Sequence, residues 1–336
     1  MPVVMTPEKS DMGAPGLTIG LVNNMPDAAL EVTEQQFASL LEAASGTQTV
    51  RLRLFALPGV PRGRDAQARI RYHYSDLRRL LRTPLDGLIV TGAEPVAEDL
   101  KQEPYWRSLI EVLRFAETNA VPTIWSCLAA HAVALHLSGV RRQRLAQKCS
   151  GLFSFEKLGD HPFMDALPSR FLMPHSRQNG LREEELEAGG FTILSRSSEA
   201  GVDMFVKDAD APFLFIQGHP EYDAHTLLRE YRRDIRRFLK HESESYPAIP
   251  FGYFDDDTAA RLARFREEAL QHRSEEMLHR LWADGEEPAL GNLWRATAAR
   301  IYANWLSLMM LKKATVVARE LVLEADHVDG AAPALQ

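Results

Sequence analysis

The chain has 336 residues, of which 45% are hydrophobic and 25% charged, an ordinary globular composition that could form one large or two ordinary domains. Its formal charge of −7 provides no basic field to attract nucleic acid or an anionic membrane, and no apolar run approaches the ~20 residues of a membrane helix. Two cysteines make no disulfide framework, and residues 1–16 lack the basic and apolar regions of a signal peptide, which together favour the cytoplasm.

Apolar strands and amphipathic helices alternate through the first part of the chain. After a disordered N-terminus at residues 1–16, the pattern predicts elements in this order: strand 17–22, helix 34–44, strand 50–56, strand 88–90, helix 105–117 and strand 121–125. The basic stretch 62–82 has few aromatic residues, so we expect a solvated or coenzyme-facing surface there and no nucleic-acid site. The alternation predicts a doubly wound, mostly parallel α/β sheet with helices on both faces.

The second part of the chain is expected to be less regular. Residues 150–217 are rich in strands and loops, and residues 226–240 form a helix. The run Asp255-Asp256-Asp257 is interpreted as a helix cap or solvated turn, since the ligand spacing of a calcium loop is missing. Two further helices follow, and the last carries an apolar stripe that should pack on the sheet or on a partner chain. Its residues are Trp294, Ala298, Ile301, Trp305 and Leu308.

These features predict a domain at 17–245, a helical extension at 246–320 that packs on the core or on a dimer partner, and a disordered tail at 321–336.

Cys127 directly follows the apolar strand 121–125 and precedes small, helix-favouring residues. A thiol on such a strand-to-helix turn lies near the partial positive charge and the N–H groups of a helix N-terminus, which is the arrangement of a nucleophile elbow. A lone cysteine is more often a small buried hydrophobe. The assignment of Cys127 as a nucleophile therefore depends on a partner elsewhere in the chain.

That partner is predicted at a second strand end. Four apolar residues, 213–216, precede Gln217 and Gly218, and His219 follows with Glu221 two residues later. In a parallel sheet, ligands bind beyond the carboxyl ends of the strands. Cys127, His219 and Glu221 would then form a triad of nucleophile, base and orienting carboxylate.

At this point the sequence resembles the homoserine O-succinyltransferases, a family with a class I glutamine amidotransferase-like fold. The resemblance covers roughly residues 17–312, and its matching segments are Leu21-Val22-Asn23-Asn24-Met25-Pro26, Asp86-Gly87-Leu88-Ile89-Val90-Thr91-Gly92-Ala93, Pro104-Tyr105-Trp106, the Cys127 turn, Lys148-Cys149-Ser150-Gly151, Pro174-His175-Ser176-Arg177, Gly218-His219-Pro220-Glu221-Tyr222-Asp223-Ala224, Arg233-Asp234, Gly291-Asn292-Leu293 and Asn304-Trp305-Leu306. The Pro-His-Ser-Arg and Gly-His-Pro-Glu-Tyr-Asp-Ala segments are the most specific of these.

The resemblance implies an enzyme that moves an acyl group, preferably succinyl, from acyl-CoA to the hydroxyl of L-homoserine in methionine biosynthesis. Acyl-CoA is a co-substrate, with no bound cofactor and no metal, the substrates are small molecules, and a homodimer is expected. Cys127 would carry the acyl group, with an oxyanion hole from the Leu128 N–H and the Gly92-Ala93 loop.

Three further residues are expected to bind substrate. Arg233 would hold the acceptor carboxylate, Ser176 would hydrogen-bond the acceptor, and Lys148 lies in a segment implicated in activity.

One loop departs from the family pattern. Relatives commonly have Thr-Gly-Ala-Pro followed by two residues that influence the acyl group, whereas this chain has Glu94-Pro95-Val96 after Ala93. A Glu94 carboxylate facing the pocket would disfavour succinyl, and a solvent-facing one would leave succinyl possible. Glu94 and Val96 are therefore candidate specificity residues.

Three alternatives stay open at this stage. The chain could be a homoserine or serine O-acetyltransferase on the same scaffold. A glutamine amidotransferase or cysteine hydrolase is disfavoured, because the turn lacks the Gly-x-Cys-x-Gly glycines. A non-catalytic protein with the same fold is disfavoured by the intact Cys127, His219 and Glu221.

Overall fold

The computed structural model describes residues 3–5, 16–208, 212–281 and 291–329, without the side chains of residues 4, 5 and 316–329. Within those ranges no helix combines the length and the apolar character needed to cross a membrane. Over the same residues, no three His, Cys, Asp or Glu side chains group where they could hold a metal ion.

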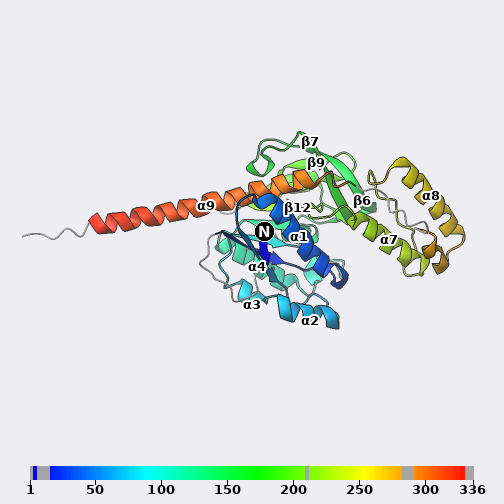
Figure 1. Ribbon diagram of the computed structural model, residues 1–336, viewed down its shortest axis with the longest axis horizontal. Coiled ribbons are helices and arrows are strands. Elements are labelled where there is room, and N and C mark those ends of the chain that lie inside the picture. The colour runs from blue at the N-terminus through cyan, green and yellow to red at the C-terminus, as the bar shows by residue number, and fades with distance from the viewer. Residues whose placement is uncertain (1–2, 6–15, 209–211, 282–290, 330–336) are drawn as a thin grey trace, which may run out of the picture.

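A large sheet forms the centre of the molecule (Figure 1). Its strands in the described chain are β1 (Val3–Met5), β2 (Leu17–Val22), β3 (Val50–Phe55), β4 (Gly87–Val90), β5 (Thr123–Ser126), β8 (Thr192–Ile193), β11 (Met204–Lys207) and β12 (Phe213–Ile216). They lie in the order β1-β3-β2-β4-β5-β12-β11-β8. Neighbours from β1 to β12 are parallel, and β11 pairs antiparallel with both β12 and β8. The predicted mostly parallel sheet is confirmed.

Helices cover both faces of this sheet. The helices are α1 (Leu30–Ser45), α2 (Arg64–His73), α3 (Leu77–Leu80), α4 (Trp106–Thr118), α5 (Leu128–Ser138), α6 (Glu183–Ala188), α7 (Thr226–Leu239), α8 (Asp256–Gln271) and α9 (Arg295–Asp329), with 3-10 turns η1 (Asp27–Ala29), η2 (Leu100–Gln102), η3 (Pro162–Met164) and η4 (Glu275–His279). Successive side chains of a strand point to opposite faces. Ile124 of β5 therefore packs in a core with α1 and α9, and Trp125 in a second core with α4 and α5.

A smaller antiparallel sheet supplies the strand-rich character expected after residue 150. Its strands in the described chain are β6 (Gln143–Lys157), β7 (Arg170–Gly180), β9 (Ser195–Ser197) and β10 (Gly201–Val202), in the order β10-β9-β6-β7. Leu152 and Phe153 of β6 and Met173 of β7 belong to the same core as α1 and α9. This sheet therefore lies against the face of the large sheet that carries α9.

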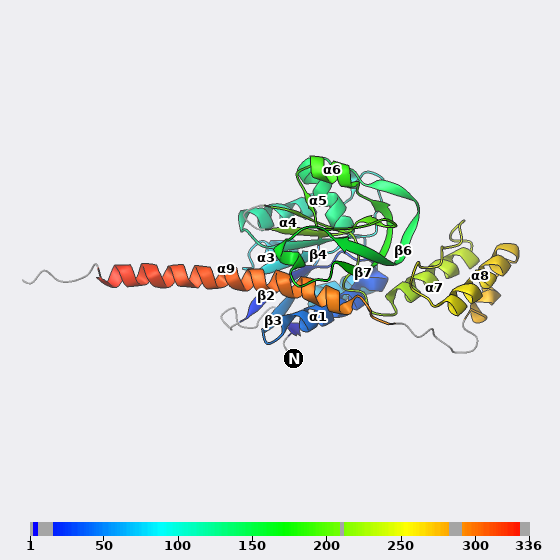
Figure 2. The same ribbon diagram turned by 90° about the horizontal axis from the view of Figure 1, so that it is seen from above.

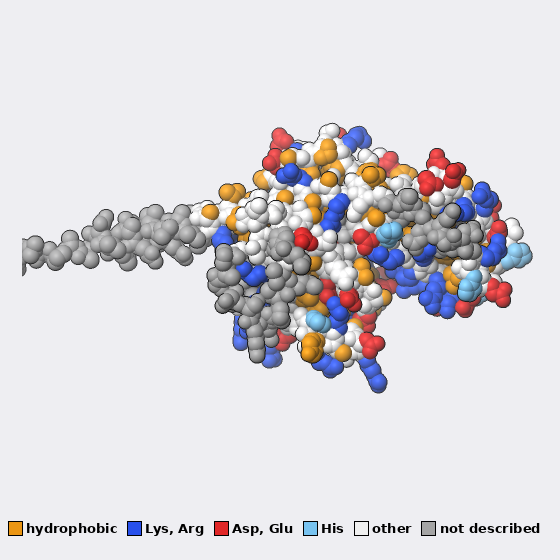
Figure 3. Space-filling model, in the orientation of Figure 1, with side chains coloured by type: hydrophobic (Ala, Val, Ile, Leu, Met, Phe, Trp, Pro, Cys, Tyr) orange, Lys and Arg blue, Asp and Glu red, His pale blue; other side chains and the backbone are white. Residues whose placement is uncertain are grey.

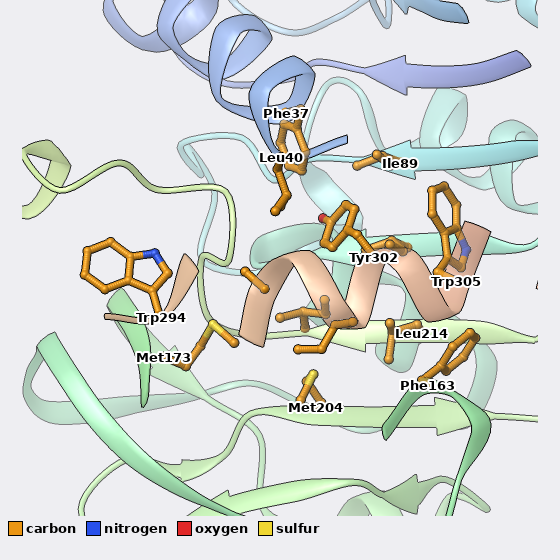
Figure 4. Packing of buried hydrophobic residues seen from close by; sticks show 14 of the residues in the cluster. Phe37, Leu40, Ile89, Phe163, Met173, Met204, Leu214, Trp294, Tyr302 and Trp305 are labelled. Atoms are coloured by element: carbon orange, nitrogen blue, oxygen red, sulfur yellow. The ribbon is translucent and has the colours of Figure 1, made fainter. Parts of the chain in front are cut away.

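The apolar stripe of the last helix is buried in this core. Trp294, Ala298, Ile301 and Trp305 are all 0% exposed, and Leu308 is partly buried. Figure 4 shows Tyr302 of α9 lying near Phe37 and Leu40 of α1, and Trp305 of α9 lying nearer Ile89 of β4. A Cβ on Gly87 would stand 2.5 Å from the sulfur of Met309 and 2.9 Å from Cζ2 of Trp305, so any side chain there would force these residues of α9 to shift.

The two segments that were expected to be disordered each contain some regular secondary structure. Val3–Met5 forms β1, which pairs in parallel with β3 at the sheet edge. Helix α9 continues through Asp329, past the predicted start of the tail at residue 321. No Gly or Pro interrupts residues 295–329, and Gly330 follows, so the stop signal lies later than predicted. Residues 1–2, 6–15 and 330–336 lie outside the described residues.

Figure 2 shows α7 and α8 at one end of the molecule and the projecting part of α9 at the other. Tyr231 and Ile235 of α7 pack against Leu262 and Phe265 of α8 in a separate small core. Asp255 caps α8, since its Oδ1 accepts a hydrogen bond from the Thr258 N–H at 2.7 Å. The cap predicted for the aspartate run is confirmed.

Candidate active site

Strand register brings the predicted catalytic residues to one edge of the large sheet. Strands β4, β5 and β12 are parallel neighbours, with Val90 opposite Trp125 and Ser126 opposite Ile216. The carboxyl ends of all three strands therefore stand side by side. Cys127 follows the end of β5 directly, Gly92 lies two residues past β4, and His219 lies three residues past β12.

Cys127 occupies a strained turn. Its backbone has φ 53° and ψ −115°, and it is the N-cap of α5, with a half-buried free thiol. A non-glycine residue rarely adopts a positive φ, and such strain gathers at functional sites. The Cys127 N–H donates to the Ile216 carbonyl at 2.7 Å, which ties the turn to β12. This is the geometry of a nucleophile elbow.

The two predicted oxyanion donors touch each other. A Cβ on Gly92 would stand 2.8 Å from both the backbone nitrogen and the Cβ of Leu128, so only glycine lets the loop come so close. Asn24 holds this loop: its N–H donates to Thr91 Oγ1 at 2.8 Å and its Nδ2 donates to the Thr91 carbonyl at 3.0 Å. Ala93 comes next and is half-buried.

His219 lies between the thiol and a carboxylate. Its Nδ1 is 2.8 Å from Glu221 Oε1, and a hydrogen bond and a charge interaction link the ring to Cys127. Because Nδ1 of His219 bonds the Glu221 carboxylate, Nε2 is the ring nitrogen available to the Cys127 thiol. Burial alone lowers the pKa of His219, but the charges of Glu221 and Cys127 outweigh it and hold that pKa well above the usual value. The imidazolium form is therefore stabilised.

Tyr222 fixes the ring of His219 from one side. The two rings stack with centroids 4.3 Å apart and planes 15° apart, and the Tyr222 hydroxyl donates to Glu230 Oε1 at 2.9 Å. Trp294 Nε1 donates to the Tyr222 carbonyl at 3.0 Å, so the last helical segment also supports this turn. Sequence reasoning did not assign a role to Tyr222, although its place in the Gly-His-Pro-Glu-Tyr segment was a signal.

A buried polar network lies behind the catalytic turn. Gly218 N–H donates to Asp203 Oδ1 at 2.8 Å, and His175 Nε2 stands 3.4 Å from the same oxygen. Arg177 Nε donates to His175 Nδ1 at 3.2 Å. Burial lowers the pKa of His175 to about 4. The hydrogen bond and the charge of Asp203 oppose this shift, and the charge of Arg177 adds to it. Sequence reasoning missed Asp203, though an acid between apolar Val202 and Met204 was a signal.

Gln217 locks the end of β12. Its Oε1 accepts from His131 Nε2 at 2.8 Å and from the Leu181 N–H at 3.2 Å, and its Nε2 donates to the Val202 carbonyl at 2.7 Å. The His131 ring is fully buried, and that burial lowers its pKa to about 3. This imidazole is therefore neutral, and its role is to hold Gln217 in place.

The predicted substrate residues Lys148 and Arg233 meet at one carboxylate. Lys148 Nζ lies 2.8 Å from Asp234 Oδ2, and Arg233 Nε donates to Asp234 Oδ1 at 2.9 Å. Ser176 lies half-buried on β7, paired in register with Ser150 of β6. The structure thus joins Lys148 and Arg233, while Ser176 stands on the neighbouring strand, two residues beyond the Pro174 carbonyl that accepts from the His219 N–H.

The predicted specificity loop faces outward. Glu94 is exposed and Val96 is 66% exposed. The N–H groups of Val96 and Ala97 donate to Glu103 Oε1 at 2.9 and 2.8 Å, so the backbone of the loop is anchored while the Glu94 carboxylate is in contact with solvent.

Comparisons with known proteins give one consistent family. A family model described as homoserine O-succinyltransferase matches residues 3–316. A homoserine O-succinyltransferase of Rhodopseudomonas palustris is 48% identical over 290 residues, which cover 86% of this chain and 87% of that one. One of Methylorubrum extorquens is 42% identical over 319 residues, covering 92% and 95%.

Solved structures with partial likeness are glutamine amidotransferases. One from Methylobacillus flagellatus has a TM-score of 0.49 and 14% identity, covering 87% of this chain and 94% of that one. Another, from Thermotoga maritima, has a TM-score of 0.45 and 13% identity, covering 79% and 98%.

Proposed function

Because the chain belongs to the homoserine O-succinyltransferase family, we propose that it transfers a succinyl group from succinyl-CoA to the hydroxyl of L-homoserine, in the cytoplasm and as a step of methionine biosynthesis. The observation that carries the proposal is the strained Cys127 turn beside His219, whose ring is held by Glu221 at 2.8 Å. The CoA thioester is the only coenzyme that the proposal requires.

In the first half-reaction the Cys127 thiolate attacks the thioester carbonyl. A bond forms between Cys127 Sγ and the carbonyl carbon, and the Leu128 N–H and the Gly92-Ala93 loop hold the resulting oxyanion. The bond to the CoA sulfur then breaks, and the His219 imidazolium gives its proton to the departing thiolate. One thioester replaces another, so this step is nearly balanced in energy.

In the second half-reaction the neutral His219 takes the proton of the homoserine hydroxyl. The alkoxide oxygen attacks the S-acyl carbon, the same donors hold the oxyanion, and the bond to Cys127 Sγ breaks. The enzyme returns to the thiolate–imidazolium pair. Glu221 stabilises the imidazolium at both stages through Nδ1.

Arg233 is proposed to bind the acceptor carboxylate, assisted by Lys148 and Ser176. Two nitrogens of its guanidinium, Nε and Nη2, face Asp234, and its side chain is 47% exposed. A guanidinium fork suits a carboxylate. Replacement of Arg233 by Lys should therefore raise the KM for homoserine and leave the rate of acylation at saturating succinyl-CoA unchanged, which steady-state and single-turnover CoA release would separate.

The exposure of Glu94 leaves succinyl possible as the acyl group. A carboxylate facing solvent repels a second carboxylate by only about 1 kcal/mol or less at the dielectric of water. Glu94 therefore does not exclude a succinyl donor, and the names of the relatives point to the same donor.

The proposal is tested in two stages with purified protein. Incubation with succinyl-CoA alone should add one succinyl group to Cys127, seen by intact mass and peptide mapping. Addition of homoserine should then release acylated homoserine and free CoA faster than serine or acetyl-CoA does. An adduct on Cys149, or a preference for acetyl-CoA or serine, would contradict the proposal.

We also infer that the enzyme is a homodimer. Helix α9 extends beyond the rest of the molecule (Figure 1), and its residue Leu311 is 67% exposed. Light scattering coupled to size-exclusion chromatography tests this assignment, and a monomer at micromolar concentration would contradict it.

A further inference from the structure

We propose that a basic pocket between α7 and η4 binds the phosphate groups of coenzyme A, an inference that rests on the proposed acyl-CoA donor. The pocket is a cavity of 710 Å³. Among the described residues that line it are Arg232, Arg233 and Arg236 of α7 and Lys240 just past its end, with Glu275 and Glu276 of η4 opposite.

The charge balance of the pocket favours an anion. Five lining residues are Arg or Lys and two are Glu, and Arg229 and Arg233 also pair with Asp223 and Asp234 at 2.7 and 2.9 Å, which leaves an excess of one positive charge (5 − 4) in a chain whose formal charge is −7. Lys240 Nζ lies 3.4 Å from Glu275, so the acidic wall neutralises part of the basic one. A basic helix face is usually only solvated, but here the basic side chains surround a cavity. Figure 3 shows Lys and Arg side chains gathered over the end of the molecule that carries α7 and α8.

Arg233 connects the pocket with the triad. It lines the cavity, and it also shares Asp234 with Lys148. Its charge interacts with Tyr222, whose ring stacks on His219. The pocket and the Lys148–Asp234 pair therefore share Arg233.

The basic wall of the pocket leads away from Arg233 along α7. From Arg233 to Lys240 helix α7 rises about 10 Å, at 1.5 Å per residue. Coenzyme A carries its phosphates at the far end of a long flexible arm from its thioester. A phosphate site must therefore lie at a distance from the Cys127 thiol, with an open path between them for this arm. Arginine forks bind phosphate oxygens in pairs, which explains a wall built mainly of Arg.

The test compares neighbouring residues of one helix. Arg236 lines the pocket and is exposed, whereas Arg237 is exposed without lining it, so Arg236→Gln and Arg237→Gln form a matched pair. Succinyl-CoA, its 3′-dephospho form and S-succinyl-pantetheine serve as donors. Loss of one charge-assisted hydrogen bond to phosphate should raise the KM of Arg236→Gln for succinyl-CoA about tenfold, with kcat unchanged.

With S-succinyl-pantetheine, which lacks the phosphates, Arg236→Gln should behave as wild type, and Arg237→Gln should match wild type with every donor. An equal KM for the two variants with succinyl-CoA would overturn the pocket assignment and leave the acyltransferase proposal standing. So would a rise in KM for Arg236→Gln that is as large with S-succinyl-pantetheine as with succinyl-CoA.

If the wild-type protein transfers no acyl group from any CoA thioester, the proposed function fails. A binding measurement then tests the pocket assignment. Calorimetry with adenosine 3′,5′-bisphosphate should then show binding to wild type and Arg237→Gln, and binding about tenfold weaker to Arg236→Gln. Equal affinities, or inorganic phosphate bound as tightly as the bisphosphate, would overturn the assignment to coenzyme A.

Discussion

At the scale of single residues, the environment of His219 determines how the thiol is used. The ring is buried, which disfavours its charged form, yet Glu221 and Cys127 together raise its pKa. Tyr222 stacks on the ring and the Pro174 carbonyl accepts from its backbone N–H at 2.8 Å, so its orientation is fixed before a substrate arrives. A preset imidazolium suits protonation of the leaving CoA thiolate.

Replacement of Glu221 by Gln should shift the pH profile of acylation. Without the carboxylate the pKa of His219 falls, so the imidazolium is lost at a lower pH than in wild type. Since the imidazolium is the proton donor to CoA, the alkaline limb of the acylation rate should move to lower pH. Single-turnover CoA release across the pH range measures this limb, and an unmoved limb would exclude Glu221 from the triad.

Cys127 and His219 should behave as one unit. Cys127→Ala removes the atom that carries the acyl group, so transfer should fall to the background rate. Addition of His219→Asn should then cost almost nothing more, because residues of one catalytic unit are strongly non-additive. The comparison needs CoA release from both single variants and the double variant. A further large loss in the double variant would show that His219 acts independently of the thiol.

Replacement of Glu94 by Gln should leave the choice of donor nearly unchanged. The side chain is exposed, so removal of its charge should alter the ratio of kcat/KM for succinyl-CoA over acetyl-CoA by less than about fivefold, which corresponds to roughly 1 kcal/mol. Competition assays with the two donors provide the ratio. A larger shift toward succinyl would mean that the loop folds over the bound donor.

At the scale of elements, the site residues that could be predicted from the sequence are those that follow the ends of apolar strands. Cys127 and His219 were predictable, because each follows an apolar strand and parallel strands share a carboxyl edge. The apolar neighbours of Asp203 marked it as unusual, but its contact with Gly218 depends on the antiparallel pairing of β11 with β12, and no local pattern specifies that register. Strand β1 has three residues and depends on its pairing with β3, so its own sequence gave too little signal.

Replacement of Gly92 by Ala should impair catalysis more than stability. The new Cβ would stand 2.8 Å from the Leu128 nitrogen and must move the loop away from α5. Displacement of one oxyanion donor lowers kcat by ~10²–10³. A suitable control is Gly291→Ala, whose Cβ would make an ordinary 3.5 Å contact with Leu293. Rates and melting temperatures of both variants give the comparison, and a Gly92→Ala enzyme of normal kcat would remove this loop from the oxyanion hole.

At the scale of the whole molecule, α9 links parts that are distant in sequence. Its buried stripe closes the core formed by α1, the large sheet and the smaller sheet. Trp294, at its start, hydrogen-bonds the turn after His219. The catalytic edge and the C-terminal helix therefore share one hydrophobic core, and global unfolding should abolish both together.

Two buried histidines, His131 of α5 and His175 of β7, should weaken the fold in mild acid. Burial lowers the pKa of His131 to about 3 and that of His175 to about 4, whereas an unfolded histidine titrates near ~6.5. As the pH falls below ~6.5 the unfolded chain therefore takes up protons that the folded chain does not, and stability is lost down to the folded pKa. The contribution of His219 to stability has the opposite sign. Its raised pKa stabilises the folded protein below pH ~6.5, and this stabilisation is lost as the pH rises through the pKa of the folded state.

Each lowered histidine should cost at most about 2 kcal/mol between pH 7 and pH 5, at roughly 1.4 kcal/mol per pKa unit. His131→Gln can still donate to Gln217 but cannot take up a proton, so its free energy of unfolding should fall less steeply over this range. His136, exposed on the same helix, supplies the matched control His136→Gln, which should keep the wild-type slope. Urea titrations of both variants at pH 7 and pH 5 test the difference. Identical slopes would show that His131 does not stay neutral in the folded protein.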